Sequence, residues 1–126
     1  MSPTDSYIMI NEKERFLEVK LSVRTFKDSG WYIAECPELD LADQGKTKRK
    51  SIENLHRMVI FSLIEAIETG NIEPMLKKLG FSKIKVPVPD LTIFNIPSEK
   101  YEKYDPLYIG TPYPLQKPAD LTASTA

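Results

Sequence analysis

A long helical pattern between Ser51 and Thr69 constrains the fold of this chain more than any other feature of its sequence. Thr47 or Ser51 can cap its start, and Gly70 can end it in the left-handed region. One apolar stripe at helical spacing consists of Ile52, Leu55, Val59, Leu63 and Ala66. Other apolar residues carry this stripe around nearly the whole circumference: Met58, Ile60, Phe61, Ile64 and Ile67. Such a helix needs cover on more than one side. We expect a sheet on one side and the C-terminal segment, another subunit or both on the other.

The residues before this helix alternate with the period of β-strands. Apolar and polar side chains alternate over residues 16–24, turn residues follow at 27–30, and residues 31–36 form a second strand-like run. This pattern is typical of an antiparallel hairpin, and residues 39–44 predict a short third strand. After the long helix, Asn71 and Gly80 bound a short second helix. Prolines restrict residues 84–88 to an edge strand, and residues 91–96 form a further apolar stretch.

These patterns predict an α/β (α+β) fold with a three- to four-stranded, mainly antiparallel sheet. The long helix and the short second helix cover that sheet. We expect a flexible N-terminus over residues 1–14, the folded domain over residues 15–96 and an extended Pro/Tyr-rich C-terminal arm over residues 97–126. The arm interleaves prolines with Tyr101, Tyr104 and Tyr108. That composition favours extended backbone, packed on its own domain or on a neighbouring subunit.

The charge balance narrows the class of partner. Lys and Arg number 17 against 18 Asp and Glu, a net charge of -1, which argues against a dedicated nucleic-acid-binding protein. One local exception precedes the long helix: Lys46, Lys48, Arg49 and Lys50. These cations are either a solvated helix entrance or a contact for nucleic-acid phosphates or an acidic partner. A single cysteine, the lack of a membrane-length apolar run and the lack of a secretory signal predict a cytoplasmic protein without membrane contact.

Few residues could carry catalysis. His56 is the only histidine and Cys36 the only cysteine, and nothing in the sequence brings them together. Four acids follow the second predicted strand, and we expect them to be solvated: Glu35, Glu38, Asp40 and Asp43. A metal-dependent nuclease using Glu35, Asp40 and Asp43 is a minor alternative. We therefore predict no enzyme, no catalytic residue, no cofactor and no metal site.

An ordered set of short motifs resembles the HicB antitoxin family. The set begins with an Asp-Ser-Gly turn and continues with three segments: Trp31 to Leu39, Gln44-Gly45-Lys46-Thr47, and Ser51-Ile52-Glu53-Asn54-Leu55 leading to Glu65-Ala66-Ile67-Glu68. The match spans residues 16–81, roughly half of the chain. Two features depart from the family. Asp40-Leu41-Ala42 stands where members often have Pro-Gly-Cys, and the C-terminal arm lacks the helical pattern of their DNA-binding domain, which argues against DNA binding.

The resemblance implies a partial ribonuclease-H-like fold without that enzyme's metal-binding carboxylates. It also implies a homo-oligomer that neutralises a small RNA-cleaving toxin of the HicA type by covering its active site. The alternative is a homo-oligomeric scaffold without a toxin. For the partner or oligomer interface we predict aromatic and apolar residues from three segments: Trp31, Tyr32, Met58, Phe61, Ile64, Tyr101, Tyr104 and Tyr108.

Overall fold

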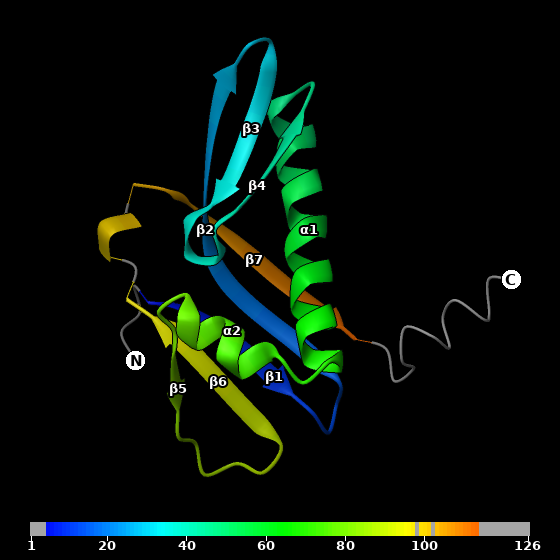
Figure 1. Ribbon diagram of the computed structural model, residues 1–126, viewed down its shortest axis with the longest axis vertical. Helices are drawn as coiled ribbons and strands as arrows, with labels where there is room; N and C mark the ends of the chain where they lie inside the picture. The colour runs from blue at the N-terminus through cyan, green and yellow to red at the C-terminus, as the bar shows by residue number, and fades with distance from the viewer. Residues whose placement is uncertain (1–4, 98, 102, 114–126) are drawn as a thin grey trace, which may run out of the picture.

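The computed structural model describes residues 5–97, 99–101 and 103–113. Its elements follow in the order β1 (Ser6–Asn11), β2 (Phe16–Asp28), β3 (Trp31–Cys36), the short 3-10 turn η1 (Pro37–Leu39), β4 (Leu41–Gly45), α1 (Lys48–Glu68), α2 (Ile72–Lys78), β5 (Ser82–Ile84), β6 (Leu91–Ile96), η2 (Glu99–Tyr101) and β7 (Asp105–Pro112). The strands form one seven-stranded antiparallel sheet in the order β4-β3-β2-β1-β6-β5, and β7 pairs with β2 outside this path. Figure 1 shows α1 and α2 on the same face of this sheet.

The long strand β2 joins the two parts of the sheet. Its first residues pair with both β1 and β7, whereas residues from Arg24 to Asp28 pair with β3. Ser29 and Gly30 link β2 to β3, with φ angles of 52° and 83°. Positive φ at both positions is what a two-residue hairpin turn with the native strand twist requires. The predicted hairpin is therefore present, with β2 extending further than the alternating pattern indicated.

The sheet is larger than the predicted three to four strands, because two strands lie in segments to which we assigned other structures. Residues 6–11, within the predicted flexible N-terminus, form β1 between β2 and β6, with Ile8 fully buried. Residues 105–112, within the predicted arm, form β7 against β2, with Leu107 and Ile109 buried. Pairing with the sheet supplies the backbone hydrogen bonds that neither segment can form alone. Within the predicted arm, residues 105–112 are thus extended and pack on the same domain, whereas Glu99–Tyr101 form the 3-10 turn η2. Residues 114–126 lie outside the described residues.

The helix α1 begins earlier than the first apolar residue suggested. Thr47 is its N-cap, and the Thr47 Oγ1 accepts a hydrogen bond of 3.0 Å from the Lys50 N–H. Ser51, the other candidate cap, lies inside the helix and is fully buried. The α1 residues fully buried against the sheet are Leu55, Val59 and Leu63 together with Ser51. Thr47 is the cap because its backbone is extended there, with φ -127° and ψ 162°.

The broad apolar stripe of α1 needs less additional cover than we expected. Four isoleucines at its margins, Ile52, Ile60, Ile64 and Ile67, are partly buried and pack against the same core as Val59. The strand β7 does not cover the outer side of α1, because it lies in the sheet beneath the helix (Figure 1). Phe61, which points away from the core, remains 69% exposed. Within the described part of the chain, Phe61 is therefore left uncovered on the outer side of α1.

The helix α2 ends as its sequence predicts. Gly80 has a φ of 103°, the Gly80 N–H donates to the Lys77 carbonyl at 3.0 Å, and the Phe81 N–H donates to the Leu76 carbonyl at 2.9 Å. This pair of bonds is the Schellman motif, and the buried Leu76 and Phe81 supply its apolar contact. Neither helix of the described chain is long and apolar enough to cross a membrane.

Candidate partner-binding surfaces

The predicted interface residues other than Tyr32 fall on two separate surfaces of the molecule. We call the side of the sheet that faces away from both helices the sheet face. In β2, Leu17, Val19, Leu21 and Val23 are buried beneath the helices, so the alternate residues point to the opposite side. Register then places the following residues on the sheet face: Phe16, Glu18, Lys20, Arg24 and Phe26 of β2, Trp31, Ile33 and Glu35 of β3, and Tyr108 of β7.

The second surface, the helix face, lies on the outer side of α1. It consists of Arg57, Met58, Phe61, Ile64 and Glu65. At about 100° per residue, Phe61 lies nearly opposite the fully buried Val59. Met58 and Ile64 are half-buried beside Phe61. The predicted residues Met58, Phe61 and Ile64 thus come together, and they are separated from Trp31, Tyr104 and Tyr108 by the thickness of the domain.

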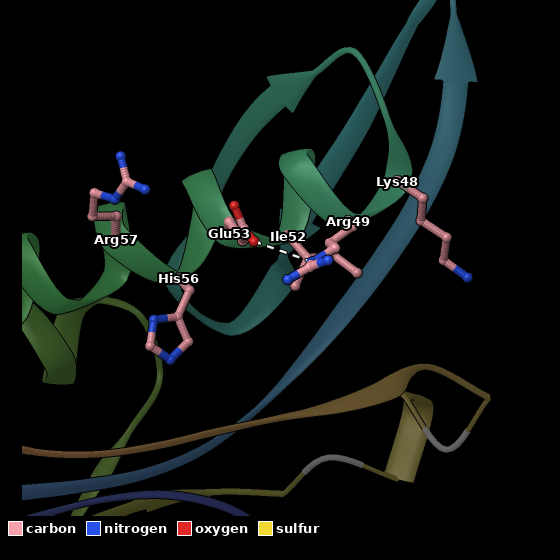
Figure 2. A pocket seen from close by; sticks show the side chains of 6 residues that line it. All are labelled: Lys48, Arg49, Ile52, Glu53, His56 and Arg57. Carbon is pink, nitrogen blue, oxygen red and sulfur yellow. Dashed lines mark ion pairs between the residues drawn. The ribbon is translucent and has the colours of Figure 1, made fainter.

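A hollow of about 770 Å³ lies along one flank of the first half of α1. Figure 2 shows its six lining residues, all from this helix: Lys48, Arg49, Ile52, Glu53, His56 and Arg57. The Arg49 Nε lies 3.3 Å and the Lys50 Nζ 3.7 Å from Glu53 carboxylate oxygens. His56 and Arg57 point in opposite directions from the helix (Figure 2). His56 therefore meets no nucleophile among the residues that line this hollow, as general-base catalysis would require.

Arg24 organises the sheet face. Its guanidinium pairs with the Glu35 carboxylate across the β2–β3 ladder. The Arg24 Cζ lies 5.0 Å from the ring centroid of Phe26 and 5.9 Å from that of Tyr104, so the cation contacts two aromatic rings. The Tyr104 ring in turn packs against Tyr101, with centroids 5.3 Å apart. These contacts fix a group of rings and one cation on a surface that no helix covers in the described chain.

The basic cluster before α1 is divided among different environments. The Lys46 Nζ lies 3.9 Å from the centroid of the Trp31 ring, a cation–π contact at the end of the hairpin. Arg49 and Lys50 pair with Glu53, as described above, whereas Lys48 lines the hollow. The four predicted nucleic-acid contacts therefore do not form one unpaired patch. Tyr32 is also set apart from Trp31, because it lies on the opposite side of β3, where Lys27 contacts its ring at 5.4 Å.

Two aromatic residues of the sheet face were not among the predicted site residues. Phe16 and Phe26 are each 38% exposed, at opposite ends of β2. They occupy positions that share a face with Glu18 and Lys20 in the alternating pattern, where a polar residue is typical of a solvated face. The sequence therefore contained a signal for these two residues, because each phenylalanine stands at a position where the alternating pattern favours a polar residue. Tyr108 lies on the same face, 64% exposed and paired in register with Lys20.

The acids after β3 do not form a metal site. Glu38, which we expected to be solvated, is only 2% exposed. Its carboxylate accepts hydrogen bonds from the Ser6 hydroxyl and, at 3.1 Å, from the Ser22 N–H. The Glu35 carboxylate forms an ion pair with the Arg24 guanidinium. Within residues 5–97, 99–101 and 103–113, no group of three His, Cys, Asp or Glu side chains could hold a metal ion.

Cys36 is a core residue next to this carboxylate. It is fully buried, and its Sγ lies 3.7 Å from the Glu38 Oε1. Burial, followed by repulsion from Glu38, raises the pKa of the thiol from 9.0 to about 12. The thiolate, which is the nucleophilic form of cysteine, is therefore disfavoured at neutral pH.

Several residues that carry the family resemblance stabilise the junction of β4 and α1. A Cβ on Gly45 would lie 2.5 Å from the Ser51 backbone nitrogen, so only glycine permits the helix to approach this closely. The Asn54 Nδ2 donates a hydrogen bond of 2.8 Å to the Gln44 carbonyl, and Thr47 caps the helix. This part of the motif set is therefore explained by packing of α1 on the sheet, without a role in chemistry.

Comparisons with protein-family models, with curated proteins and with solved structures gave no match to this chain. The resemblance to HicB antitoxins thus depends on the short motifs alone.

Proposed function

We propose that this chain is a non-catalytic, cytoplasmic protein-binding module that acts as a HicB-like antitoxin. In this proposal the part of the sheet face around Arg24, Phe26 and Tyr104 binds a small RNA-cleaving toxin and covers its active site. The observation that carries the proposal is the Arg24 guanidinium held against Phe26 and Tyr104 on a sheet face without helical cover.

The composition of this surface favours a protein partner. Energetically dominant residues in protein interfaces are enriched in Trp, Tyr and Arg, and the sheet face offers Trp31, Tyr108 and Arg24. The side chain of Arg24 is already positioned by Glu35 and the two rings, so binding would order it little further. Such preorganisation lowers the entropic cost of association.

A role without catalysis is supported by the chemistry of the titratable groups. Cys36 has a raised pKa and is buried, and the hollow around His56 contains no hydroxyl or thiol side chain. Glu35 and Glu38, two of the acids that could have bound a metal, are engaged by Arg24 and by the serines of β1 and β2. These observations favour binding over hydrolysis as the function of the domain.

The experiment is co-expression of this chain with the small protein encoded beside its gene, followed by co-purification and a titration of the purified partner. The variant Phe26→Ser removes one ring that contacts Arg24. Phe16→Ser is its matched control, because Phe16 has the same exposure on the same strand and lies roughly 33 Å away, at about 3.3 Å per residue. We expect Phe26→Ser to weaken binding about tenfold or more, which corresponds to about 1.4 kcal/mol. Phe16→Ser should bind within about twofold of the wild type.

Two results would refute this proposal. One is the absence of a complex between the wild-type chain and the neighbouring protein, with no reduction of that protein's toxicity or RNA cleavage. The other is equal affinity of Phe26→Ser and Phe16→Ser for the toxin, since the sheet face around Arg24 would then lie outside the interface.

A further inference from the structure

We infer that an extended acidic segment of a partner protein adds as a further strand to the open edge of β2 at residues 24–28, below the flank of α1 that carries the hollow. This contact does not depend on the proposed toxin contact, which uses side chains of the sheet face. The inference depends on three features: a run of unpaired backbone groups, a hollow next to them, and an excess of cations around that hollow.

The second half of β2 has a partner strand on one edge only. Residues 24–28 pair with β3, and the pairing of β7 with β2 stops at Val23, which lies opposite Asp105. Among the described residues no other strand pairs with residues 24–28. Figure 1 shows this half of β2 in the hairpin that extends beyond the rest of the sheet. The open edge is about 16 Å long, at about 3.3 Å per residue.

The hydrogen bonds between β2 and β7 show to which side the odd-numbered residues of β2 point. The Tyr113 N–H donates to the Arg15 carbonyl at 2.9 Å, one step beyond the last pair of the β2–β7 ladder. In an antiparallel ladder, hydrogen-bonded pairs alternate with non-hydrogen-bonded ones. Every second residue from Arg15 to Val23 therefore directs its N–H and C=O groups to β7.

The hairpin gives the same alternation from the other side of β2. Its two-residue turn makes the residues that flank it, Asp28 and Trp31, a hydrogen-bonded pair. Even-numbered residues of β2 therefore bond to β3, and the N–H and C=O groups of Thr25 and Lys27 point outward, on the side that β7 occupies beside residues 16–23. An incoming strand can form hydrogen bonds with these groups, which is how many proteins recognise extended peptides.

The other outer edges of the described sheet are less suited to a new strand. In β4 the Gln44 carbonyl already accepts a hydrogen bond from an α1 side chain, and β5 is only three residues long. In β7, Pro106 and Pro112 stand at positions that point away from β2, where they offer no N–H. On the open edge of β2, by contrast, the Lys27 Nζ lies 5.4 Å from the Tyr32 ring centroid, so this side chain lies over the hairpin and leaves the edge accessible.

The hollow of α1 lies on the side of the helix next to this edge. Asn54 donates a hydrogen bond to Gln44, so its side of α1 faces β4. His56, which lines the hollow, lies about 200° around the helix from Asn54, at about 100° per residue. Because β3 and then β2 follow β4 in the sheet, this opposite flank of α1 faces β2 (Figure 2). The hollow of about 770 Å³ therefore leaves room for side chains of a strand added beside residues 24–28.

The charges around the hollow favour an acidic segment. Its lining contains three cations, Lys48, Arg49 and Arg57, against the single acid Glu53, a net charge of 3 - 1 = +2. Within the described residues neither Lys48 nor Arg57 has an ion pair. The first turn of α1 has no acidic residue, so the positive end of the helix dipole adds to the charge of these side chains. An added strand directs every second side chain to the helix side, where acidic residues meet these cations.

Two other anionic or local occupants fit these features less well. A nucleic acid could pair its phosphates with the cations, but phosphates only accept hydrogen bonds, whereas the edge of β2 alternates donors with acceptors. Residues 114–126 of this chain contain one cation, Lys117, and one acid, Asp120, so they have no net charge to complement the hollow. The backbone edge therefore selects a peptide, and the cations select an acidic one from a partner protein.

The test uses the full chain labelled with ¹⁵N and a synthetic peptide of about eight residues in which Glu and Val alternate. In the free chain, the amide hydrogens of Thr25 and Lys27 should exchange with solvent at least about tenfold faster than that of Phe26, which bonds to β3. Adding the peptide should shift the amide resonances of Thr25 and Lys27 and slow their exchange, with a Kd below about 1 mM. A peptide with Lys in place of Glu should bind at least about tenfold more weakly.

Two pairs of variants test the backbone and the charge separately. Thr25→Pro removes an outward N–H and should weaken the acidic peptide at least about tenfold, whereas Thr25→Val keeps that N–H and should bind within about twofold of the wild type. Lys48→Glu should weaken the acidic peptide about tenfold and strengthen the Lys-Val peptide. Lys85→Glu, the same change at an exposed lysine outside the hollow, should change neither affinity by more than about twofold. Circular dichroism shows whether each variant keeps its fold, and the Lys48 pair decides the outcome if Thr25→Pro does not.

Three results would overturn the inference. The first is equal exchange protection of Thr25, Phe26 and Lys27 in the free chain, because the edge would then be covered. The second is the absence of shifts at Thr25 and Lys27 with about 1 mM acidic peptide, or equal binding of the Glu-Val and Lys-Val peptides. The third is a concentration-dependent dimer in light scattering that Thr25→Pro abolishes, because a second copy would then occupy the edge. Lys48→Glu leaves the sheet face unchanged, so toxin binding by this variant should equal that of the wild type, and the failure of either proposal leaves the other in place.

Discussion

Replacing Gly45 with alanine tests whether the Gln-Gly-x-Thr motif serves the packing of α1 on the sheet. The added Cβ would lie 2.5 Å from the Ser51 backbone nitrogen and 2.8 Å from the Lys50 carbonyl carbon. Ordinary contacts begin at 3.4 Å, so the strand and the helix must separate by about 0.9 Å, the difference between 3.4 and 2.5. Both atoms belong to the backbone of a packed helix, so a change of side-chain rotamer cannot relieve the contact.

The expected loss of stability follows from three contributions. Overpacking costs about 2 kcal/mol, within the usual range for an added methylene. The separation also strains the Asn54–Gln44 hydrogen bond, which contributes about 1 kcal/mol. Alanine restricts the unfolded chain and returns about 0.7 kcal/mol. We therefore expect Gly45→Ala to lower the free energy of unfolding by about 2 kcal/mol.

Urea denaturation followed by circular dichroism measures this difference. With a denaturant slope of about 2 kcal/mol per molar, the midpoint should fall by about 1 M while the slope stays constant. The control is Gly110→Ala, whose Cβ would meet only the Phe16 ring, 3.4 Å from Cζ and 3.7 Å from Cε1, both ordinary contacts. It should stay within about 0.5 kcal/mol of the wild type. Equal stability of Gly45→Ala and Gly110→Ala would refute the close-approach explanation of the motif.

Two further predictions concern the helix cap and the buried thiol. Thr47→Ala should lower the free energy of unfolding by about 1 kcal/mol, because the Lys50 N–H loses its acceptor, and Thr47→Asp should retain stability in the same urea measurement. Cys36 has a pKa raised from 9.0 to about 12, so its contribution to stability is complete below pH 9 and is lost as the pH rises from 9 towards 12. The loss should be about 1.4 kcal/mol per pH unit. Urea midpoints between pH 8 and 10.5 should therefore decline more steeply for the wild type than for Cys36→Ala, and equal slopes would contradict a buried protonated thiol.

The local elements could be predicted from the sequence because their signals lie within a few residues. The Ser29-Gly30 turn and the Gly80 end of α2 each follow from backbone preferences of the residues themselves. Thr47 and Ser51 were both possible caps of α1, and the structure shows that Thr47 is the cap. The two missed strands have weaker local signals. In β1, Met9 interrupts the alternation of Ile8 and Ile10 with polar residues, and in β7 prolines lie near both ends of the strand. Their strand conformation depends on pairing with the distant β2, which no local pattern reports.

The candidate surfaces could likewise be predicted only where their signal is local in the sequence. The excess of apolar residues on α1 predicted cover beyond the sheet, but most of these residues pack against the core of the same domain, and Phe61 remains exposed. The importance of Arg24 could not be predicted, because its contacts join β2 to Tyr104, eighty residues later in the chain. Likewise, the burial of Glu38 depends on Ser6, which belongs to a strand that the sequence did not reveal.

By itself, the sequence determined the local elements of this protein: the hairpin, the two helices with the glycines that follow them, and the amphipathic pattern that directs one side of α1 to a sheet. These depend on interactions between residues close in the chain, which composition and spacing record directly. Only the tertiary structure decided that the predicted interface residues other than Tyr32 separate onto two opposite surfaces. That separation depends on the register of β2 with β3 and β7, since a shift of one residue would exchange the buried and exposed sides of every strand.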